Sequence, residues 1–214
     1  MDHAFWHSKW QNNHIAFHEP QGSPLLVAHH PVLTAPPSPR VLVPLCGKTR
    51  DIGYLLSKGC EVVGVELSEL AINQLFDELG ESPEITQTQT HKRYSIPGLT
   101  VFEGDFFALQ RDDIGAVTGV YDRAALIALP ASMRGQYAQQ VNKLSGGAEQ
   151  LLICVDYKQA DMPGPPFAVS TDEVTALYAP HYSITLLASE DVAGKLKGKV
   201  PACNQVYRLS SQTE

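Results

Sequence analysis

Short runs of apolar residues alternate with amphipathic segments along most of the chain. The runs at 41–45, 61–66 and 99–103 predict buried strands, because they are too short for core helices and end at glycine or acidic residues. Between the first two, residues 51–58 have helical spacing. After the second, Ser68 predicts the N-cap of a helix that extends to about residue 79. Strands that alternate with helices are typical of an α/β fold with a parallel sheet.

The second half of the chain continues this alternation. The pattern predicts strands at 115–121 and 150–155, helices at 133–144 and 171–178, and two late strands at 183–187 and 205–209. Residues 80–98 are polar and weakly periodic, which favours a hairpin or a surface insertion. The prediction is therefore one Rossmann-like α/β domain, with a mainly parallel central sheet, an antiparallel C-terminal strand and helices on both faces.

The first 39 residues differ from the rest. Trp6 and Trp10 are four positions apart and would share one face of a helix. Six of the eight histidines lie in the first 30 residues, but Glu19 is the one residue there that could complete a zinc site with them, so we predict no metal site. Four prolines within 31–39 indicate a linker. We therefore predict that residues 1–39 form a lid helix and a linker before a core at 40–214.

The turn after the first predicted strand indicates the kind of ligand. It contains the single glycine Gly47, and Glu66 ends the next strand nineteen positions later, a spacing typical of a βαβ nucleotide-binding unit. A dinucleotide site usually has three glycines, which give a pyrophosphate room at the helix N-terminus. A P-loop would need glycine at position 42, which is Leu42. The turn thus favours an adenosine ligand without phosphates, and S-adenosylmethionine is the obvious candidate.

Candidate site residues follow the predicted strands, because ligands bind at the carboxyl ends of parallel strands. Glu66 would bind the ribose hydroxyls, although it could also serve the helix that begins at Ser68. Asp105 and Phe106 would contact the adenine, although Asp105 could be only an N-cap. Arg123 could hold the cofactor carboxylate or the acceptor, or form an ion pair with a surface acid.

Two aromatic groups could complete the site. Trp6 and Trp10 either cover the core or place an indole ring near a sulfonium cation, which cation–π attraction would favour. The stiff loop 163–167 ends in Phe167 and would form the other wall, around a planar apolar acceptor.

Composition limits the partners. The net charge of −7 argues against a nucleic-acid partner, and no apolar run approaches the length of a membrane span. The cysteines are too widely spaced for a zinc site or a disulfide framework, so we expect reduced thiols in a cytoplasmic monomer that acts on a small molecule. Cys46 lies in the ligand turn, where we interpret it as a small residue that fills space rather than as a nucleophile.

Several motifs together resemble those of the thiopurine S-methyltransferase family in its bacterial form. They are Trp6-x-x-x-Trp10, Ala16-Phe17-His18, Val43-Pro-Leu-Cys-Gly-Lys48, Val62-Val-Gly-Val-Glu-Leu-Ser-Glu-Leu70, Asp122-Arg123-x-Ala125-Leu126 and Pro163-Gly-Pro-Pro-Phe167. The resemblance implies a methyltransferase that uses S-adenosylmethionine and methylates the sulfur of aromatic or heterocyclic thiols such as thiopurines. Selenium or tellurium compounds are further acceptors that we consider.

The resemblance also implies roles for particular residues. Trp10, Leu45, Glu66 and Arg123 would contact the cofactor, Asp105 and Phe106 the adenine, and Trp6 and Phe17 would belong to the segment that closes over the site. Phe17 and Phe167 would contact the acceptor. Where mammalian members have a second arginine late in the chain, this sequence has only Lys195, Lys197 and Lys199, which keep the charge but lose the planar fork.

Two alternatives remain at this point. An NAD-dependent oxidoreductase would also have an acid after the second strand, although the single glycine argues against it. A non-catalytic binding module could use the same fold, because a fold does not determine a function.

Overall fold

The computed structural model describes residues 3–15 and 18–212, and in this part of the chain nine strands form a single sheet. The strand order is β3-β4-β5-β2-β1-β6-β7-β9-β8. The five central strands are parallel: β5 (Leu99–Glu103), β2 (Glu61–Glu66), β1 (Arg40–Pro44), β6 (Gly119–Arg123) and β7 (Glu149–Asp156). The chain order reverses between β1 and β6, so the carboxyl ends of these two strands border the crevice where ligands of such sheets bind.

Antiparallel strands extend the sheet at both edges. At one edge, β9 (Cys203–Ser211) pairs with β7, and β8 (Tyr182–Asp191) pairs with β9. At the other edge, the hairpin of β3 (Glu84–Gln87) and β4 (Lys92–Ile96) pairs with β5. The structure thus confirms the predicted fold class, and the polar segment 80–98 contains a hairpin that lengthens the sheet.

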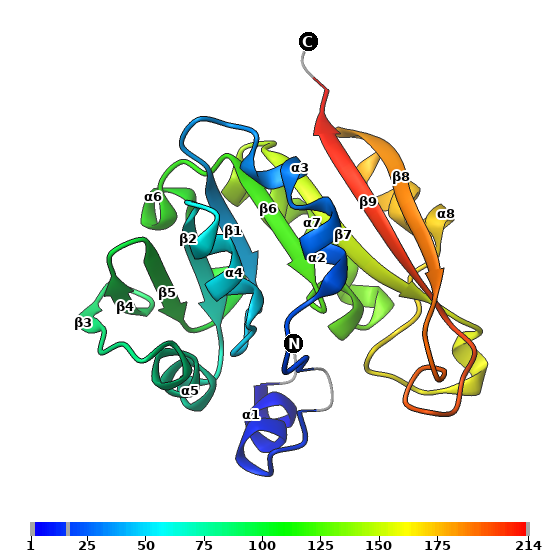
Figure 1. Ribbon diagram of the computed structural model, residues 1–214, viewed down its shortest axis with the longest axis horizontal. Coiled ribbons are helices and arrows are strands. Elements are labelled where there is room, and N and C mark those ends of the chain that lie inside the picture. Colours follow the sequence, from blue (N-terminus) through cyan, green and yellow to red (C-terminus); the bar gives the residue numbers. More distant parts are fainter. Residues whose placement is uncertain (1–2, 16–17, 213–214) are drawn as a thin grey trace.

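Helices cover both faces of the sheet (Figure 1). One face is covered by α2 (Pro24–His29), α3 (Pro31–Thr34), α4 (Asp51–Ser57) and α5 (Glu69–Leu79), and the other by α6 (Arg111–Ile114), α7 (Ala131–Ser145) and α8 (Thr171–Tyr178). Side chains of β1 alternate between the two cores, with Val41 and Val43 in one and Leu42 in the other. Three short 3₁₀ turns, η1 (Phe106–Ala108), η2 (Leu126–Ala128) and η3 (Gln159–Asp161), follow β5, β6 and β7.

Two sequence predictions were wrong in detail. Residues 31–39 were interpreted as a linker, but α3 begins at Pro31 and α2 at Pro24, because proline is well accommodated in the first turn of a helix, where its missing N–H has no helical partner. The strand predicted at 115–121 begins only at Gly119 and continues through Arg123. The segment before Gly119 forms a loop, in which Thr118 accepts a hydrogen bond from the backbone N–H of Arg40 at 2.8 Å.

Helix α1 (His3–Gln11) lies beyond the carboxyl ends of the central strands, outside the two helical layers (Figure 1). Trp6 and Trp10 both lie on this helix, as their spacing predicted. Its position means that the N-terminal segment covers the edge of the sheet at which a ligand is expected.

Candidate cofactor site

The turn after β1 is shaped for close approach of backbone. Leu45 and Gly47 both have left-handed backbone, with φ of 48° and 54°, a conformation that is rare for a residue such as leucine. A Cβ added at Gly47 would lie 3.0 Å from Cζ2 of Trp10, so the indole ring of α1 packs directly on this glycine. Trp10 is 4% exposed. The structure therefore brings together three elements that the sequence predicted as one site: Trp10, Leu45 and the single glycine.

Glu66 anchors this turn from the end of β2. One carboxylate oxygen accepts a hydrogen bond from the Gly47 N–H at 2.8 Å, and the other accepts one from the Ser68 N–H at 2.8 Å. Burial raises the pKa of Glu66, although the backbone N–H groups of Ser68, Gly47 and Leu67 oppose that rise. The Ser68 side chain caps α5, as predicted, by accepting from the Ala71 N–H. Each oxygen of Glu66 retains a lone pair, so the carboxylate could hold the loop and accept from a ligand hydroxyl as well.

Asp105 follows β5 and is the N-cap of η1, where its Oδ1 accepts from the Phe107 N–H at 3.0 Å. Its other oxygen lies 3.7 Å from Nε2 of His3, on the same helix as both tryptophans. The carboxylate is about one-third exposed and open to a further donor. Phe106 is fully buried and its ring packs against Tyr137 at 5.3 Å between centroids. A ligand contact at Phe106 stays a prediction, and with the ring in the core it would be made by the backbone of this residue.

Arg123 ends β6 and forms an ion pair with Glu19 in the N-terminal segment. This pair is the ion pair with an acid that the sequence left open. The neighbouring Asp122 points elsewhere, because it accepts from the Leu126 N–H at 3.2 Å and from the Tyr137 hydroxyl at 2.7 Å inside the core. Oε2 of Glu19 is buried and has no hydrogen-bond partner among the residues that the structure describes. A ligand with a positive and a negative group could donate to the free oxygen of Glu19 and bind the Arg123 guanidinium.

The N-terminal segment, defined as residues 3–15 and 18–23, contacts residues at the carboxyl ends of β5, β1 and β6. His3 approaches Asp105, Trp10 packs on Gly47, Glu19 pairs with Arg123, and the Ser23 N–H donates to Asp51 at 2.7 Å. Trp6 packs edge-on against Phe5, with ring centroids 5.2 Å apart. The predicted acceptor residue Phe17 lies outside the described residues. One segment thus contacts the carboxyl ends of three strands, β5, β1 and β6, and the start of α4.

His18 lies among charged groups of both signs. Its pKa is lowered, first by burial and then by Lys48, Arg50 and Arg123, while Glu78 opposes the change. Lys48 and Arg50 are both paired with Glu78, at 2.9 and 3.2 Å. Lys48, Arg50 and Arg123 are thus all paired with carboxylates of the chain, and a negative group on a ligand would have to compete with Glu78 or Glu19 for them.

Phe167 lies in the stiff loop after β7. Its backbone N–H donates to Ile127 at 2.7 Å, its ring covers Gly164, and the Arg134 guanidinium lies 5.9 Å from the ring centroid. Lys197, from the β8–β9 connection, donates to the carbonyl of Pro165 at 2.7 Å, and burial lowers its pKa. Lys197, one of the three late lysines 195, 197 and 199, is thus hydrogen-bonded to this loop.

Comparisons with known proteins identify the family of the chain. The family model described as Thiopurine S-methyltransferase (TPMT) matches residues 1–210. The chain belongs to the thiopurine S-methyltransferase family. It is 47% identical over 210 residues to the thiopurine S-methyltransferase of Xanthobacter autotrophicus, covering 98% of this chain and 99% of that protein. It is 46% identical over 195 residues to that of Pseudomonas aeruginosa, covering 91% and 89% of the two chains.

Solved structures share the fold at low sequence identity. An S-adenosylmethionine-dependent methyltransferase of Anabaena variabilis has a TM-score of 0.65 at 12% identity, covering 97% of this chain and 94% of that one. The 1,6-didemethyltoxoflavin-N1-methyltransferase of Burkholderia thailandensis, solved with S-adenosylhomocysteine, has a TM-score of 0.63 at 17% identity, covering 98% and 87%. Family membership confirms the predicted enzyme class, an S-adenosylmethionine-dependent methyltransferase; the oxidoreductase and non-catalytic alternatives are not confirmed.

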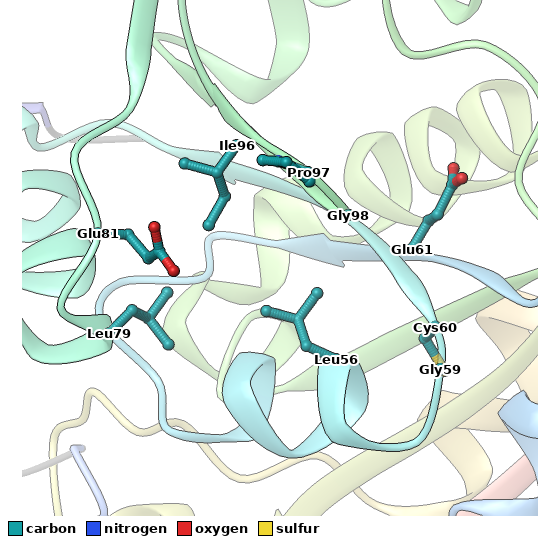
Figure 2. Close-up of a pocket in the computed structure, with 9 residues that line it drawn as sticks. All are labelled: Leu56, Gly59, Cys60, Glu61, Leu79, Glu81, Ile96, Pro97 and Gly98. Carbon is teal, nitrogen blue, oxygen red and sulfur yellow. The ribbon is translucent and has the colours of Figure 1, made fainter.

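A cavity of about 370 Å³ lies at the end of the central strands opposite to the candidate cofactor site. Figure 2 shows its apolar walls, where the side chains of Leu56, Leu79 and Ile96 face one another. Glu61 and Gly98 also line it, and because they mark the starts of β2 and β5, the cavity lies at the amino ends of the strands. It is therefore separate from the candidate cofactor site.

Other findings concern the predictions from composition. All four cysteines are free, and Cys46 is buried with a pKa raised well above its usual value by burial, which fits a packing role. Within residues 3–15 and 18–212, no cluster of three or more His, Cys, Asp or Glu residues could hold a metal ion. No helix in that same part is long and apolar enough to cross a membrane.

Three residues with clear structural roles at this site were missed by the sequence reasoning. Glu19 was considered only as a zinc ligand, and its pairing with Arg123 joins positions about a hundred residues apart. Asp51 is 1% exposed and accepts from both Ser23 and the Tyr121 hydroxyl. An acid at the start of the first helix after the ligand turn could have suggested such an anchor. The third residue is His91, whose Nε2 lies 3.0 Å from the backbone carbonyl of Asp105. No motif or spacing in the sequence pointed to His91.

Proposed function

We propose that this protein transfers the methyl group of S-adenosylmethionine to the sulfur of an aromatic or heterocyclic thiol. The observation that supports it most is that the N-terminal segment, through Trp10 and Glu19, contacts the Gly47 turn held by Glu66 and the end of β6 at Arg123, in a chain of this family. The products would be a thioether and S-adenosylhomocysteine.

The residues at the strand ends fit the proposed cofactor. Glu66 would accept from the ribose hydroxyls with its remaining lone pairs, and Asp105 from the adenine amine. The backbone of Leu45 and Gly47 would approach the ligand, because Gly47 has no side chain to obstruct it. Trp10 would lie beside the sulfonium group, where an aromatic ring is favourable.

When bound, S-adenosylmethionine supplies an electrophilic methyl group on a sulfonium sulfur. The chain then has to align the acceptor and exclude water, and it needs no nucleophile of its own. A thiol acceptor is already partly ionised near neutral pH, so the residues need not include a dedicated base. The sulfur forms its bond to the methyl carbon as the methyl–sulfonium bond breaks, and the electron pair stays on the cofactor sulfur.

Arg123 would hold the negative charge of the acceptor, directly or through water, or the carboxylate of the cofactor. Either group would compete with Glu19 for the guanidinium. Phe167 would form the apolar wall for a planar acceptor, in a loop that Lys197 contacts through Pro165. Because the reaction needs a soft, polarisable nucleophile, selenium and tellurium compounds belong to the same proposal.

Ligand-dependent thermal stability tests the cofactor. A ligand that binds only the folded state raises the melting temperature by mass action, so S-adenosylhomocysteine should raise it while NADH should not. Transfer of labelled methyl from S-adenosylmethionine to thiophenol and to 6-mercaptopurine then tests the acceptor class. A rise with NADH alone would overturn the proposal, and a rise with S-adenosylhomocysteine without labelled thioether would overturn its thiol part.

A further inference from the structure

His91 lies in the turn of a surface hairpin but is 1% exposed. Strand β3 is exposed at all four positions, and the hairpin is anchored in the core through Tyr94 of β4, which is also 1% exposed. His91 is a second buried side chain of the hairpin and, unlike a core residue, it is polar, so its ring must have hydrogen-bond partners.

The turn holds the His91 backbone firmly. The Thr88 N–H and hydroxyl donate to the His91 carbonyl at 2.8 and 2.9 Å, and the His91 N–H lies 3.0 Å from the same hydroxyl oxygen. The Gln87 amide donates to that carbonyl at 3.1 Å. These bonds leave the ring with little freedom to move relative to the sheet.

The ring connects this turn to the loop after β5. Nε2 of His91 lies 3.0 Å from the backbone carbonyl of Asp105, and because a carbonyl can only accept, Nε2 carries the proton. Nδ1 then accepts from the Thr90 hydroxyl at 2.7 Å. Both ring nitrogens therefore have a partner, with the tautomer fixed by the Asp105 carbonyl and Nδ1 satisfied by the Thr90 hydroxyl.

Packing fixes the loop against the same ring. Gly104 has φ of 148°, and a Cβ there would lie 2.5 Å from Cδ2 of His91, so a side chain at this position would collide with the imidazole. The other side of the ring meets Phe102 edge-on, at 6.3 Å between centroids. The backbone of residues 104–105 therefore rests on His91 and cannot move toward it.

We propose that His91 is a positioning residue that holds Asp105 in place for the adenine amine. Asp105 carries the partly open carboxylate at this strand end, and its backbone carbonyl accepts both from Nε2 of His91 and from the Ala108 N–H of η1 at 2.9 Å. The inference rests on the proposed function, because it assigns His91 a role in binding the base of that cofactor. The hairpin is then part of the cofactor site although it does not touch the ligand.

Calorimetric titration with two ligands tests this role. One is S-adenosylhomocysteine and the other is its analogue with hydrogen in place of the 6-amino group. His91→Phe keeps an aromatic ring, although a larger one, but removes the donor, and should weaken S-adenosylhomocysteine about tenfold, equivalent to ~1.4 kcal/mol. The analogue cannot donate to Asp105, so its affinity should change less than twofold, while His91→Gln, which retains an N–H donor, should restore part of the loss.

Two further variants keep the test decisive. Ile85→Thr changes an exposed residue of the same hairpin and should leave both affinities unaltered. If His91→Phe fails to fold, Thr90→Val removes the hydroxyl that satisfies Nδ1 while the ring remains; the ring is then held by one partner fewer, and a smaller loss with the same selectivity is expected. Equal weakening of both ligands, or no weakening, would overturn the positioning role. Failure of the unmodified protein to bind S-adenosylhomocysteine would instead overturn the proposed function.

Discussion

Asp122 provides a quantitative prediction about stability. Its side chain is fully buried and accepts from Tyr137 and from the Leu126 N–H, yet burial raises its pKa from 3.8 to about 6. A carboxyl whose pKa is higher in the folded state binds more protons when folded. It therefore contributes stability at low pH that is lost as the pH rises through about 6.

The magnitude follows from the two pKa values. A difference of about two pKa units is equivalent to about 3 kcal/mol in total, of which about 1.4 kcal/mol is lost between pH 5 and pH 8. Asp122→Asn has no charge to bury, and its oxygen can still accept from the Leu126 N–H. The free energy of unfolding of the variant, relative to the unmodified protein, should therefore rise by about 1.4 kcal/mol from pH 5 to pH 8.

Urea unfolding at several pH values between 5 and 8 measures this difference. Asp77→Asn is the matched control, because Asp77 is exposed on α5, and its difference from the unmodified protein should not vary with pH. A difference for Asp122→Asn that stays constant within about 0.3 kcal/mol would refute the argument, since the linked protonation would then be missing.

Three further predictions concern the candidate site. Glu66→Gln should weaken S-adenosylhomocysteine by about 10- to 100-fold in calorimetry, while Glu61→Gln, at the exposed start of the same strand, should not; unchanged affinity removes Glu66 from the site. Gly47→Ala should lower the free energy of unfolding by about 1–3 kcal/mol more than Gly80→Ala, because both have positive φ but only Gly47 meets a neighbouring ring; equal losses contradict the packing. Arg123→Lys should lower kcat/KM for a thiol acceptor about tenfold in a methyl-transfer assay, and an unchanged value would exclude a bidentate role.

The strands that position the site could be predicted because their signals are local. β2 spans the predicted residues, and so does β5, since each is a buried apolar run bounded by glycine and an acid. The capping of α5 by Ser68 could likewise be predicted, because serine just before an amphipathic segment is a preferred N-cap residue. Local chemistry therefore identified the strand ends, and with them Glu66, Asp105 and Arg123 as candidates.

The contacts across the site could not be predicted in the same way. The pairing of Glu19 with Arg123 and the hydrogen bond from His91 to Asp105 depend on how distant elements meet in three dimensions. Phe106 illustrates the opposite limit, because a residue that follows a strand end can turn either to the ligand or to the core, and its ring packs in the core. Period and spacing carry no information about that choice.

The position of the N-terminal segment has a practical consequence for the expressed protein. His3 lies beside Asp105, at the carboxyl ends of the central strands. Strand β9 is antiparallel to β7 and ends at Ser211, toward the amino ends of the central strands (Figure 1). An affinity tag fused ahead of α1 would emerge next to the cofactor site and could compete with the docking of Trp10. A tag fused after β9 would emerge far from it, so ligand affinities are best measured on protein tagged at its C-terminus.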